Sequence, residues 1–333
     1  HVTNHAVLRA LNANTVSIQY RRIARGGAKQ TAYNFHYISN TNESLDESQI
    51  NVDFQVKPES NPPTNIHVII GRNGVGKTRL MKNILGSIVT GEDKYGIFKI
   101  SDEYSSGLLY SSNSKENRLT NIIYVAFSAF DNTSSEEYNI KEDMTPLIRV
   151  GLPQKSDKSN ENIFESIVKD FKESLNNCLN MNKYKLWKDT IENLYTDPIF
   201  KDVLMAEVIE DSNKINIKTI ENTYKKLSSG HKIILLTLTK IIEHIEEKSL
   251  IILDEPENHL HPPLLSSFMR SLSQLVIFKN AVAIIATHSP VILQEVPKKC
   301  VKKLRRNGKI VKVDELERET FGENISVIQK RIT

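Results

Sequence analysis

A glycine-rich run in the N-terminal half of the chain carries residue types that bind a nucleotide phosphate. Gly71 to Thr78 reads Gly-Arg-Asn-Gly-Val-Gly-Lys-Thr and fits the pattern G-x-x-x-x-G-K-[ST] at every fixed position. Backbone N–H groups of such a loop curl around phosphates, because glycines leave no side chains in the way, and a following helix adds partial positive charge. Lys77 would reach the β- and γ-phosphates, and Thr78 would ligate Mg²⁺. The residues expected to bind the nucleotide are Asn73, Gly74, Val75, Gly76, Lys77, Thr78 and Arg79.

Two adjacent carboxylates follow an apolar run further along the chain. Leu250 to Leu253 precedes Asp254 and Glu255, and a buried strand would deliver both at its carboxyl end, beside the phosphate loop of an open α/β sheet. Asp254 is expected to hold Mg²⁺ through water. Glu255 is expected to be the general base that deprotonates a water. The two motifs together predict an ATPase that uses ATP and Mg²⁺.

These loops need a parallel sheet to position them. The apolar run 66–70 predicts a buried strand before the glycine loop, and 77–89 predicts a helix after it. Further strands are expected at 122–127, 250–253 and 282–286, with helices at 231–248 and 263–278. Three β-rich stretches near the start, at 15–20, 31–39 and 50–56, predict an antiparallel lobe, and a hairpin is expected at 301–316.

The stretch between these α/β segments has helical periodicity, with apolar residues recurring at helical spacing from Ile163 to Tyr195. The predicted fold class is therefore α/β: a P-loop NTPase with a mostly parallel sheet, an N-terminal antiparallel β lobe and an inserted helical lobe. We expect residues 1–131 to form the N-terminal half of an ATPase head, 132–225 the helical insertion, and 226–333 the C-terminal half of the head.

Further motifs resemble those of ABC-type ATPases. Leu227 to Lys232 (Leu-Ser-Ser-Gly-His-Lys) resembles the signature L-S-G-G-Q, and His288 in Ala-Thr-His-Ser-Pro resembles the switch histidine. Residues 254–262, Asp-Glu-Pro-Glu-Asn-His-Leu-His-Pro, look like the Walker B motif and D-loop of the non-transport branch, which includes RecF-like, SMC-like and OLD-type proteins. The resemblance implies an ABC-ATPase-type fold.

The same resemblance implies that two protomers, in a homodimer or a higher homo-oligomer, enclose two ATP molecules. Ser228, Ser229 and Gly230 would then contact the γ-phosphate of the other protomer, and His288 would contact it in its own protomer as a catalytic residue. Asn258 would lie where the protomers touch. Loss of the γ-phosphate would separate them, so hydrolysis would act as a switch.

A narrower resemblance is to the ATPase subunit of Septu-type and retron-associated antiphage systems. Phe127 to Asp131, the run 254–262 and Glu319 to Asn324 carry it. It implies a chain without nuclease activity of its own that regulates a separate HNH nuclease. In retrons the ATPase also acts with a reverse transcriptase and its noncoding RNA and DNA. The chain would then contact nucleic acid through a partner. It also implies a further C-terminal region.

Three residues depart from the ABC-type pattern. The signature has Ser229 where Gly is usual and His231 where Gln is usual. No Q-loop glutamine follows the strand 122–127, and Ser128 or Asp131 would stand in its place. A slowly hydrolysing or tightly regulated ATPase would fit these departures.

Other functions stay open on the sequence alone. A RecF- or SMC-like DNA-repair ATPase would often carry a long coiled coil before the signature, whereas the stretch here is short and lacks sustained heptads. An OLD-type nuclease would add an acidic metal-binding cluster after the ATPase, and none follows in this sequence. A transporter ATPase would need a membrane partner and a proper Q-loop.

Composition sets the broad class. The 333 residues are 39% hydrophobic and 25% charged, which excludes collagen and low-complexity disorder. The two cysteines, Cys178 and Cys300, lie far apart, which favours a reducing compartment, the cytoplasm, over a disulfide or a zinc site. No apolar run approaches the ~18 residues of a membrane span, so no membrane association is expected. The net charge of +4 permits a nucleic-acid partner without requiring one.

Three groups of residues have a structural explanation that we weigh above a functional one. The basic residues between Lys298 and Lys309 are expected to form the solvated face of a hairpin rather than a nucleic-acid contact. Tyr33, Phe35 and Tyr37 alternate along one strand and predict core packing rather than stacking on adenine. His259 and His261 are interpreted as D-loop packing rather than as metal ligands.

Overall fold

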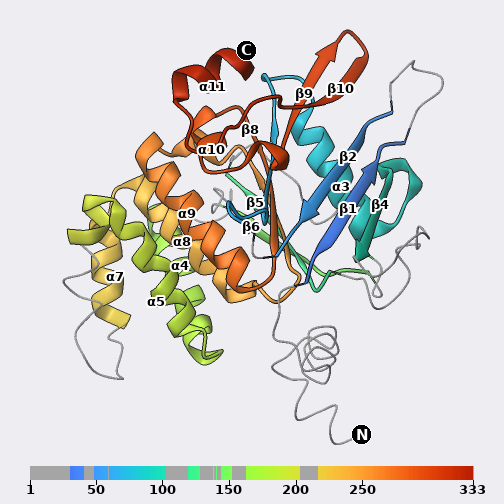
Figure 1. Cartoon of the computed structure of the whole chain (residues 1–333). Helices are drawn as coiled ribbons and strands as arrows, with labels where there is room; N and C mark the ends of the chain where they lie inside the picture. The colour runs from blue at the N-terminus through green and yellow to red at the C-terminus, as the bar shows by residue number, and fades with distance from the viewer. Residues whose placement is uncertain are drawn as a thin grey trace, which may run out of the picture.

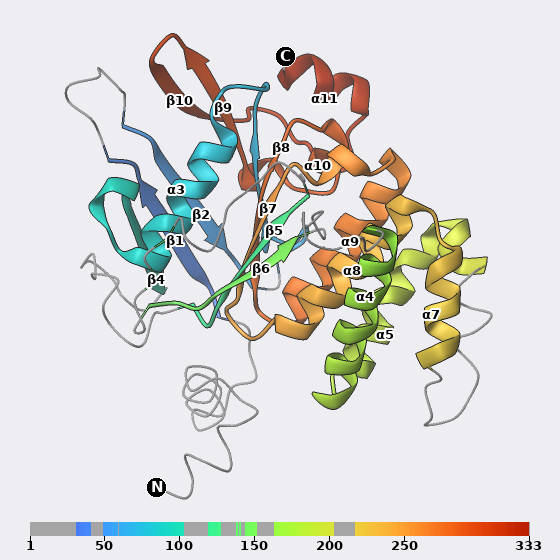
Figure 2. The same cartoon turned by 180° about the vertical axis from the view of Figure 1, so that it is seen from behind.

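The chain folds around two β-sheets that are flanked by helices (Figures 1 and 2). The computed structural model describes residues 31–40, 49–58, 60–102, 119–127, 138, 140, 144–151, 163–202 and 217–332. Within these ranges a seven-stranded sheet occupies the centre, and a three-stranded sheet lies to one side of it.

The large sheet is parallel except at one edge. Its strands are β3 (Ile66–Ile70), β5 (Ile122–Ala126), β6 (Leu147–Gly151), β7 (Leu250–Asp254), β8 (Val282–Thr287), β9 (Val301–Asn307) and β10 (Ile310–Glu315), in the order β10-β9-β3-β8-β7-β5-β6. Only the hairpin pair β9–β10 is antiparallel. Every residue of β3, β7 and β8 is buried, as expected for strands covered on both faces.

The order of the central strands decides which loops meet. β8 comes last of the three along the chain, yet it lies between β3 and β7. Ile70 at the end of β3 pairs with Thr287, and Asp254 at the end of β7 pairs with Ala286. The three loops that follow these strands therefore leave the sheet at one level, on the same edge.

The small antiparallel sheet has the order β2-β1-β4, with β1 (Tyr33–Ile38), β2 (Asn51–Val56) and β4 (Ile97–Asp102). Tyr33, Phe35 and Tyr37 of β1 are at most 2% exposed, which confirms their predicted role in the core. β4 was not predicted from the sequence. The expected strand at 15–20 lies outside the described residues.

Helices cover the two faces of the large sheet. The helices are α3 (Lys77–Thr90), α4 (Ile163–Asn180), α5 (Tyr184–Glu192), α7 (Ile217–Lys226), α8 (Ser229–His244), α9 (Pro262–Phe278), α10 (Pro290–Gln294) and α11 (Ile325–Ile332), with short 3-10 turns η2 (Asp93–Tyr95), η5 (Asn193–Thr196), η6 (Pro256–His259) and η7 (Lys298–Cys300). In Figure 2, α3 lies on the side of the small sheet, whereas α4, α5, α7, α8 and α9 gather on the other side.

The core is divided by the large sheet into two clusters. Ile252 of β7 packs in one cluster with Leu80 of α3 and with the small sheet, whereas its neighbour Ile251 packs in the other with Leu235 of α8. Successive side chains of a strand point to opposite faces. Therefore α3 and α8 pack against opposite faces of the sheet.

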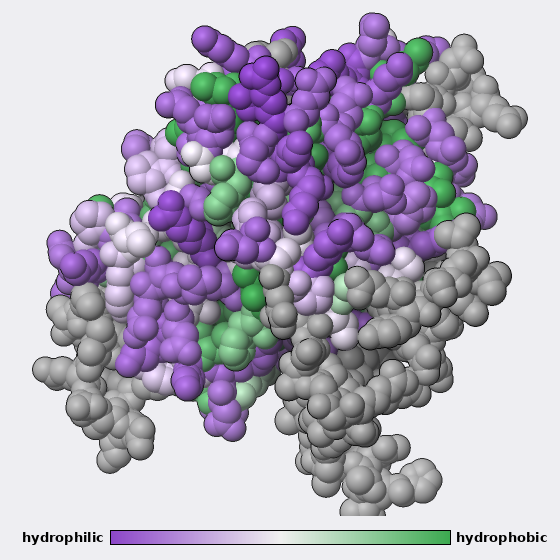
Figure 3. All heavy atoms as spheres, viewed as in Figure 1, coloured by the Kyte–Doolittle hydropathy of each residue, from purple (hydrophilic) through white to green (hydrophobic). Residues whose placement is uncertain are grey.

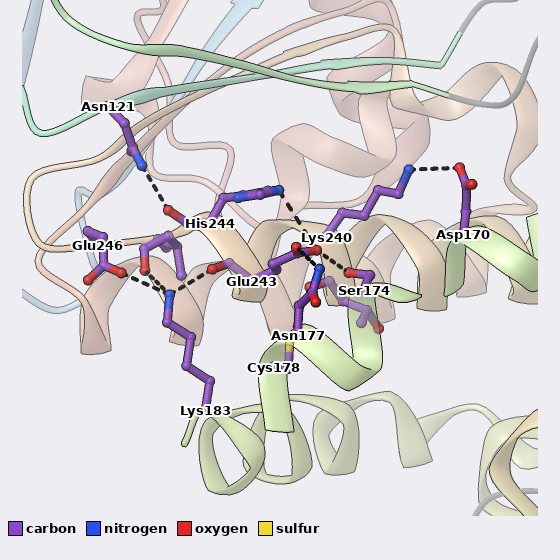
Figure 4. Close-up of polar contacts among 12 residues, drawn as sticks. Asn121, Asp170, Ser174, Asn177, Cys178, Lys183, Lys240, Glu243, His244 and Glu246 are labelled. Atoms are coloured by element: carbon purple, nitrogen blue, oxygen red, sulfur yellow. Dashed lines mark hydrogen bonds and ion pairs between the residues drawn. The ribbon is translucent and has the colours of Figure 1, made fainter. Parts of the chain in front are cut away.

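Polar contacts attach the helices α4 and α5 to the end of α8 (Figure 4). Ser174 and Asn177 of α4 donate hydrogen bonds to the two carboxylate oxygens of Glu243, at 2.6 and 2.7 Å. Lys183, just before α5, donates to the backbone oxygens of Glu243 and Ile245, at 2.8 and 3.2 Å, and forms an ion pair of 2.9 Å with Glu246. A cation on the last carbonyls of a helix stabilises its C-terminus.

The range 132–225 contributes both helices and a strand to the fold. Its helices share one apolar cluster with the strands and with α8, and the buried Trp187 donates a hydrogen bond of 2.9 Å to Thr239 Oγ1 of α8. The same range also supplies β6, the edge strand beside β5.

The basic hairpin is only partly the solvated face that the sequence predicted. Lys302 and Lys303 of β9 are buried. Lys302 forms an ion pair of 2.6 Å with Glu315, and Lys303 Nζ donates to the Arg331 backbone oxygen at 2.6 Å. Both side chains are therefore used inside the fold, because β9 pairs with β3 rather than standing free.

The α/β fold class predicted from the sequence is confirmed: the chain has a mostly parallel sheet, an antiparallel β-sheet of three strands and a set of helices, and its glycine-rich loop joins β3 to α3 as in a P-loop NTPase. Hydrophilic side chains cover most of the face seen in Figure 3. Among the residues that the structure describes, no helix has the length and apolar character needed to cross a membrane.

Candidate nucleotide-binding site

The glycine-rich loop follows β3 and has a backbone that other residues would not adopt easily. A side chain at Gly71 would place its Cβ 2.8 Å from the Leu304 backbone oxygen, so β9 leaves room for glycine alone. Gly76 has φ +104°, a conformation that L-residues with side chains rarely adopt. The loop is thereby fixed between β9 and the start of α3.

Helix α3 begins directly after this loop with its N-terminus open to a ligand. Gly76 is the N-cap, no side chain caps the helix, and its first turn holds no acidic residue. The first N–H groups of a helix lack partners within the helix and carry partial positive charge, so they suit a phosphate. Around this start Asn73, Gly74 and Arg79 are exposed, and Val75, Gly76 and Thr78 are half-buried.

Lys77 is buried and already points into the site. Its Nζ lies 3.0 and 3.2 Å from the backbone oxygens of Gly71 and Arg72, and 3.3 Å from Glu255 Oε1. The structure thus brings together the two motifs that the sequence placed far apart. The lysine is held where the loop, the helix start and the end of β7 meet.

The two carboxylates at the end of β7 lie in different environments. Asp254 is the last residue of the strand and is 3% exposed. Glu255 has φ +46° and donates its backbone N–H to the Ala286 oxygen at 2.9 Å. Such a conformation is uncommon for a residue with a side chain and is found at functional sites. It turns the chain sharply, so that the Glu255 carboxylate faces Lys77.

The Glu255 carboxylate is ionised in this environment. Burial would raise its pKa, but the hydrogen bond from Asn258 and the charge of Lys77 together lower the pKa below the ordinary value, with His288 adding to the effect. Asn258 Nδ2 donates to Glu255 Oε2 at 3.2 Å. An ionised carboxylate can accept a proton from water, as a general base must.

Thr78 and Asp254 fit the hard oxygen ligands that Mg²⁺ prefers. One offers a hydroxyl from the first turn of α3, and the other offers a buried carboxylate at the end of β7. Mg²⁺ usually takes one or two protein ligands and fills its shell with phosphate oxygens and water. A dedicated cage of protein carboxylates is therefore unnecessary here.

His288 directly follows β8, so it lies between the loops that carry Lys77 and Glu255. Its Nδ1 is 3.0 Å from Glu257 Oε1 and 3.8 Å from Glu255 Oε1. About two fifths of its side chain is exposed, at 41%. The predicted switch histidine is thus beside the predicted base.

Glu257 is a residue of this site whose role the sequence did not reveal. Its Oε1 accepts hydrogen bonds from Thr287 Oγ1 at 2.5 Å and from the His288 backbone N–H at 2.7 Å, in addition to its contact with the His288 ring. Its side chain is only 8% exposed. Glu257 therefore fixes both the loop and the ring of His288, and we regard it as a positioning residue.

The signature residues lie elsewhere in the chain. Ser228 and Ser229 are exposed and Gly230 is half-buried, at the N-terminus of α8. They begin α8, which packs against the opposite face of the sheet from α3. Their predicted contact with a phosphate in a second protomer stays a prediction.

The segment Glu319 to Asn324 has a structural role beside the helix that follows His288. Glu319 Oε1 accepts backbone hydrogen bonds from Lys298, Thr320 and Phe321, at 2.8, 2.8 and 3.0 Å. The Gln294 side-chain amide, at the end of α10, donates to the Glu323 backbone oxygen at 2.5 Å. The segment thus holds α10, the helix that follows His288.

Ser128 and Asp131, the candidates for the Q-loop position, lie outside the described residues.

A family model matches one third of the chain. Residues 189–294, which include the signature, the two carboxylates and His288, match the family described as "AAA domain, putative AbiEii toxin, Type IV TA system". The match supports an ATPase of the ABC or AAA type for this part of the chain. It does not include the glycine-rich loop.

Two relatives are similar over much longer stretches. Protein ea59 of Escherichia phage lambda is 33% identical over 350 aligned residues, which cover 99% of this chain and 65% of that protein. Septu protein PtuA of Bacillus mycoides (strain KBAB4) is 24% identical over 295 residues, which cover 79% of this chain and 38% of that protein.

Solved structures that align with the chain include ATP-binding cassettes. One is cbiO1 from Clostridium perfringens, part of the ABC transporter complex cbiONQ, with a TM-score of 0.42 and 16% identity over 86% of this chain and 87% of that chain. Another is a nucleotide-free ATP-binding cassette from an ABC transporter, with a TM-score of 0.40 and 14% identity over 91% and 94% of the two chains. The chain spans less than two thirds of the length of both relatives, ea59 and PtuA.

Proposed function

We propose that this chain is an ATP-binding and ATP-hydrolysing head that dimerises around ATP and regulates a partner protein. The observation that carries the proposal is the meeting of Lys77, Glu255 and His288 at one edge of the sheet, with Lys77 Nζ 3.3 Å from Glu255 Oε1. These residues come from three separate loops, and each matches a motif of the expected type. The match of residues 189–294 to an ATPase family supports the same function.

In the proposed mechanism the γ-phosphate binds at the start of α3. Lys77 would exchange its contacts with the loop carbonyls for phosphate oxygens, while the helix N–H groups bind the β-phosphate. Mg²⁺, held by Thr78 and through water by Asp254, would neutralise charge on the phosphate oxygens. Glu255 would take the proton of the attacking water. His288 would bind the γ-phosphate, with its ring held by Glu257.

The second half of each proposed site comes from another copy of the chain. Ser228 and Ser229 are exposed and Gly230 is half-buried at the start of α8, and all three would contact the γ-phosphate held by the partner protomer. The likeness to the ABC signature supports this arrangement. Asn258 would link the two protomers to Glu255, to which it already donates a hydrogen bond.

The partner we propose is a nuclease of the HNH type in a Septu-like antiphage system. The motif likeness of residues 254–262 and 319–324 and the 24% identity to Septu protein PtuA support this setting. We do not extend the proposal to retron components, because neither relative's name refers to a retron. Cutting of nucleic acid would reside in the partner.

Phosphate release by the purified chain tests the enzymatic part of the proposal. Turnover should require Mg²⁺ and be lost in Lys77→Ala and in Glu255→Gln. Magnesium-independent turnover, or turnover unchanged in both variants, would contradict the site. Co-purification from the native host tests the partner: a stoichiometric HNH protein supports the proposal, and a DNA-repair complex in its place would contradict it.

A further inference from the structure

Three side chains form a hydrogen-bonded row at the start of α8. Ser228 Oγ lies 2.5 Å from His231 Nδ1, and His231 Nε2 lies 3.2 Å from Asp197 Oδ1. Ser228 is exposed, whereas the side chains of His231 and Asp197 are 8% and 13% exposed. The row therefore runs from the surface of the signature into the helical part of the chain.

The hydroxyl of Ser228 is not used as an N-cap serine usually is. Such a serine normally accepts a hydrogen bond from a backbone N–H two or three residues later. Here Ser228 is the N-cap of α8, but its side chain makes no cap hydrogen bond and binds His231 instead. The helix N-terminus is left for an external acceptor, and the serine oxygen is held beside it.

His231 is fixed in place from two other directions. Its ring packs edge-on against Phe200, with ring centroids 4.8 Å apart and an interplanar angle of 63°. Asp197 Oδ1, which faces His231 Nε2, also accepts the backbone N–H groups of Ile199 and Phe200 at 2.9 and 3.3 Å. The ring thus has little freedom to turn, and its position depends on the segment 197–200.

We propose that Asp197 and His231 form a positioning relay that holds the Ser228 hydroxyl for the phosphate bound by a second copy of this chain. This inference rests on the proposed function, since that phosphate belongs to the proposed dimer. The relay requires a hydrogen on both ring nitrogens: Nε2 donates to the Asp197 carboxylate and Nδ1 donates to Ser228 Oγ, which leaves the Ser228 hydrogen for a phosphate oxygen. A hydroxyl fixed in this way binds a phosphate oxygen without first losing rotamer freedom. The relay also links the phosphate contact to the helical segment through Asp197, so movement of that segment would release Ser228.

The relay depends on His231, which stands where the signature usually has Gln. A Gln at the third position of a helix usually reaches back to the N-cap backbone N–H in a capping box. The imidazole here instead binds the serine hydroxyl through one nitrogen and the helical segment through the other. The departure from the signature pattern at His231 is therefore accounted for by this contact.

The test uses ATP-dependent dimerisation of the full chain carrying Glu255→Gln, in which hydrolysis should be blocked. In this background we compare Ser228→Ala, His231→Phe and the double variant. His231→Phe keeps a ring against Phe200 and removes both nitrogens. Each single change should raise the ATP concentration for half-maximal dimer by ~10-fold, and the double variant should be no weaker than Ser228→Ala alone, because both changes remove one interaction.

The outcomes separate the relay from the proposed function. Absence of any ATP-dependent dimer in the Glu255→Gln chain would overturn the proposed dimer and the relay with it. An unaffected dimer in Ser228→Ala would leave the dimer standing but would overturn the contact of Ser228 with the phosphate, and therefore the relay. Two outcomes would overturn the relay alone, provided that Ser228→Ala raises the ATP concentration for half-maximal dimer as expected. One is no change in that concentration in His231→Phe. The other is a double variant in which the effects of the two single changes multiply.

A conservative pair at Asp197 distinguishes positioning from support of the local fold. Asp197→Asn keeps an oxygen that can accept from His231 and from the two backbone N–H groups, so it should retain dimerisation within ~3-fold. Asp197→Ala removes the acceptor and should resemble His231→Phe. The same loss in Asp197→Ala whether or not Ser228 has been replaced would show a structural role and would overturn the relay.

Discussion

The Lys77 ammonium lies 3.3 Å from the Glu255 carboxylate, so the cation expected to bind phosphate and the base expected to activate water form an ion pair. A γ-phosphate must share Lys77 with this carboxylate. The ion pair lies at the edge where β3, β8 and β7 end together, and it joins two motifs that are far apart in the sequence. The ion pair predicts that replacing the two residues has opposite effects on the affinity for ATP.

Replacing Glu255 by Gln should separate binding from turnover. The change keeps the shape of the side chain but removes the charge that competes with phosphate for Lys77, so ATP should bind at least as tightly as in the unmodified chain. Turnover should fall ~100-fold or more, since a general base contributes that much. Calorimetric titration gives the affinity, and phosphate release gives the rate. Glu317→Gln, at an exposed position, is the control, and unchanged hydrolysis would exclude Glu255 as the base.

Replacing Lys77 by Ala should weaken nucleotide binding. The change removes the buried cation and leaves Glu255 without its ion pair, so a phosphate would meet a negative charge instead of a positive one. We expect the dissociation constant for ATP to rise ~10-fold or more, which is about 1.4 kcal/mol. Lys82→Ala, on the same helix α3, is the matched control. Binding of ATP by Lys77→Ala with the original affinity would contradict the phosphate-loop assignment.

Replacing Glu257 by Gln should lower the rate without weakening ATP binding. The uncharged amide keeps an oxygen for Thr287 and the His288 N–H, but it loses the charge beside the His288 ring. We expect kcat to fall ~10-fold, the size of one lost charge-assisted hydrogen bond. The affinity for ATP should stay within ~2-fold. Equal losses of kcat in Glu257→Gln with and without His288→Ala would indicate that Glu257 acts independently of the histidine.

The site was predictable from the sequence wherever local pattern determined structure. The apolar runs before Gly71 and before Asp254 needed no partner to be recognised as buried strands, and β3 and β7 lie where the sequence placed them. The contact of Glu257 with His288 spans 31 residues and exists because β8 is inserted between β3 and β7. Strand order is a property of the whole sheet, so no local pattern could reveal it.

The strand β4 and the partner of His231 illustrate the same limit. β4 reads Ile-Phe-Lys-Ile-Ser-Asp, too short and mixed to predict, and it is a strand because Phe98 stacks on Phe35 of β1 with ring centroids 5.5 Å apart. Asp197, directly after η5, meets His231 of α8 across 34 residues of sequence, a contact that only the tertiary fold creates. In both cases long-range packing decides which local structure is adopted.

Replacing Lys183 by Met should destabilise the fold without changing the nucleotide site. The ammonium holds two terminal carbonyls of α8 and the Glu246 carboxylate (Figure 4), and Met keeps the apolar stem but none of these bonds. We expect the free energy of unfolding to fall by ~2 kcal/mol. Urea denaturation measures the loss, and ATP affinity should be unchanged. Lys185→Met, at an exposed position of α5, should have little effect, and equal losses in the two variants would contradict the capping role.

Replacing Glu319 by Ala should reduce stability in a pH-dependent way. Burial would raise the pKa of this carboxyl, but three backbone N–H groups and Lys298 lower it below the ordinary value. A carboxyl whose pKa is lower in the folded state binds more protons when unfolded, so its stabilising effect is present above the unfolded pKa of about 4.3 and is lost as the pH falls through the folded pKa. The difference in Tm between the unmodified chain and the variant should therefore be largest near pH 7 and shrink below pH ~4. Thermal unfolding at both pH values measures it, with Glu317→Ala as the control, and a difference that grows on acidification would show that the N–H groups do not favour the ionised carboxylate.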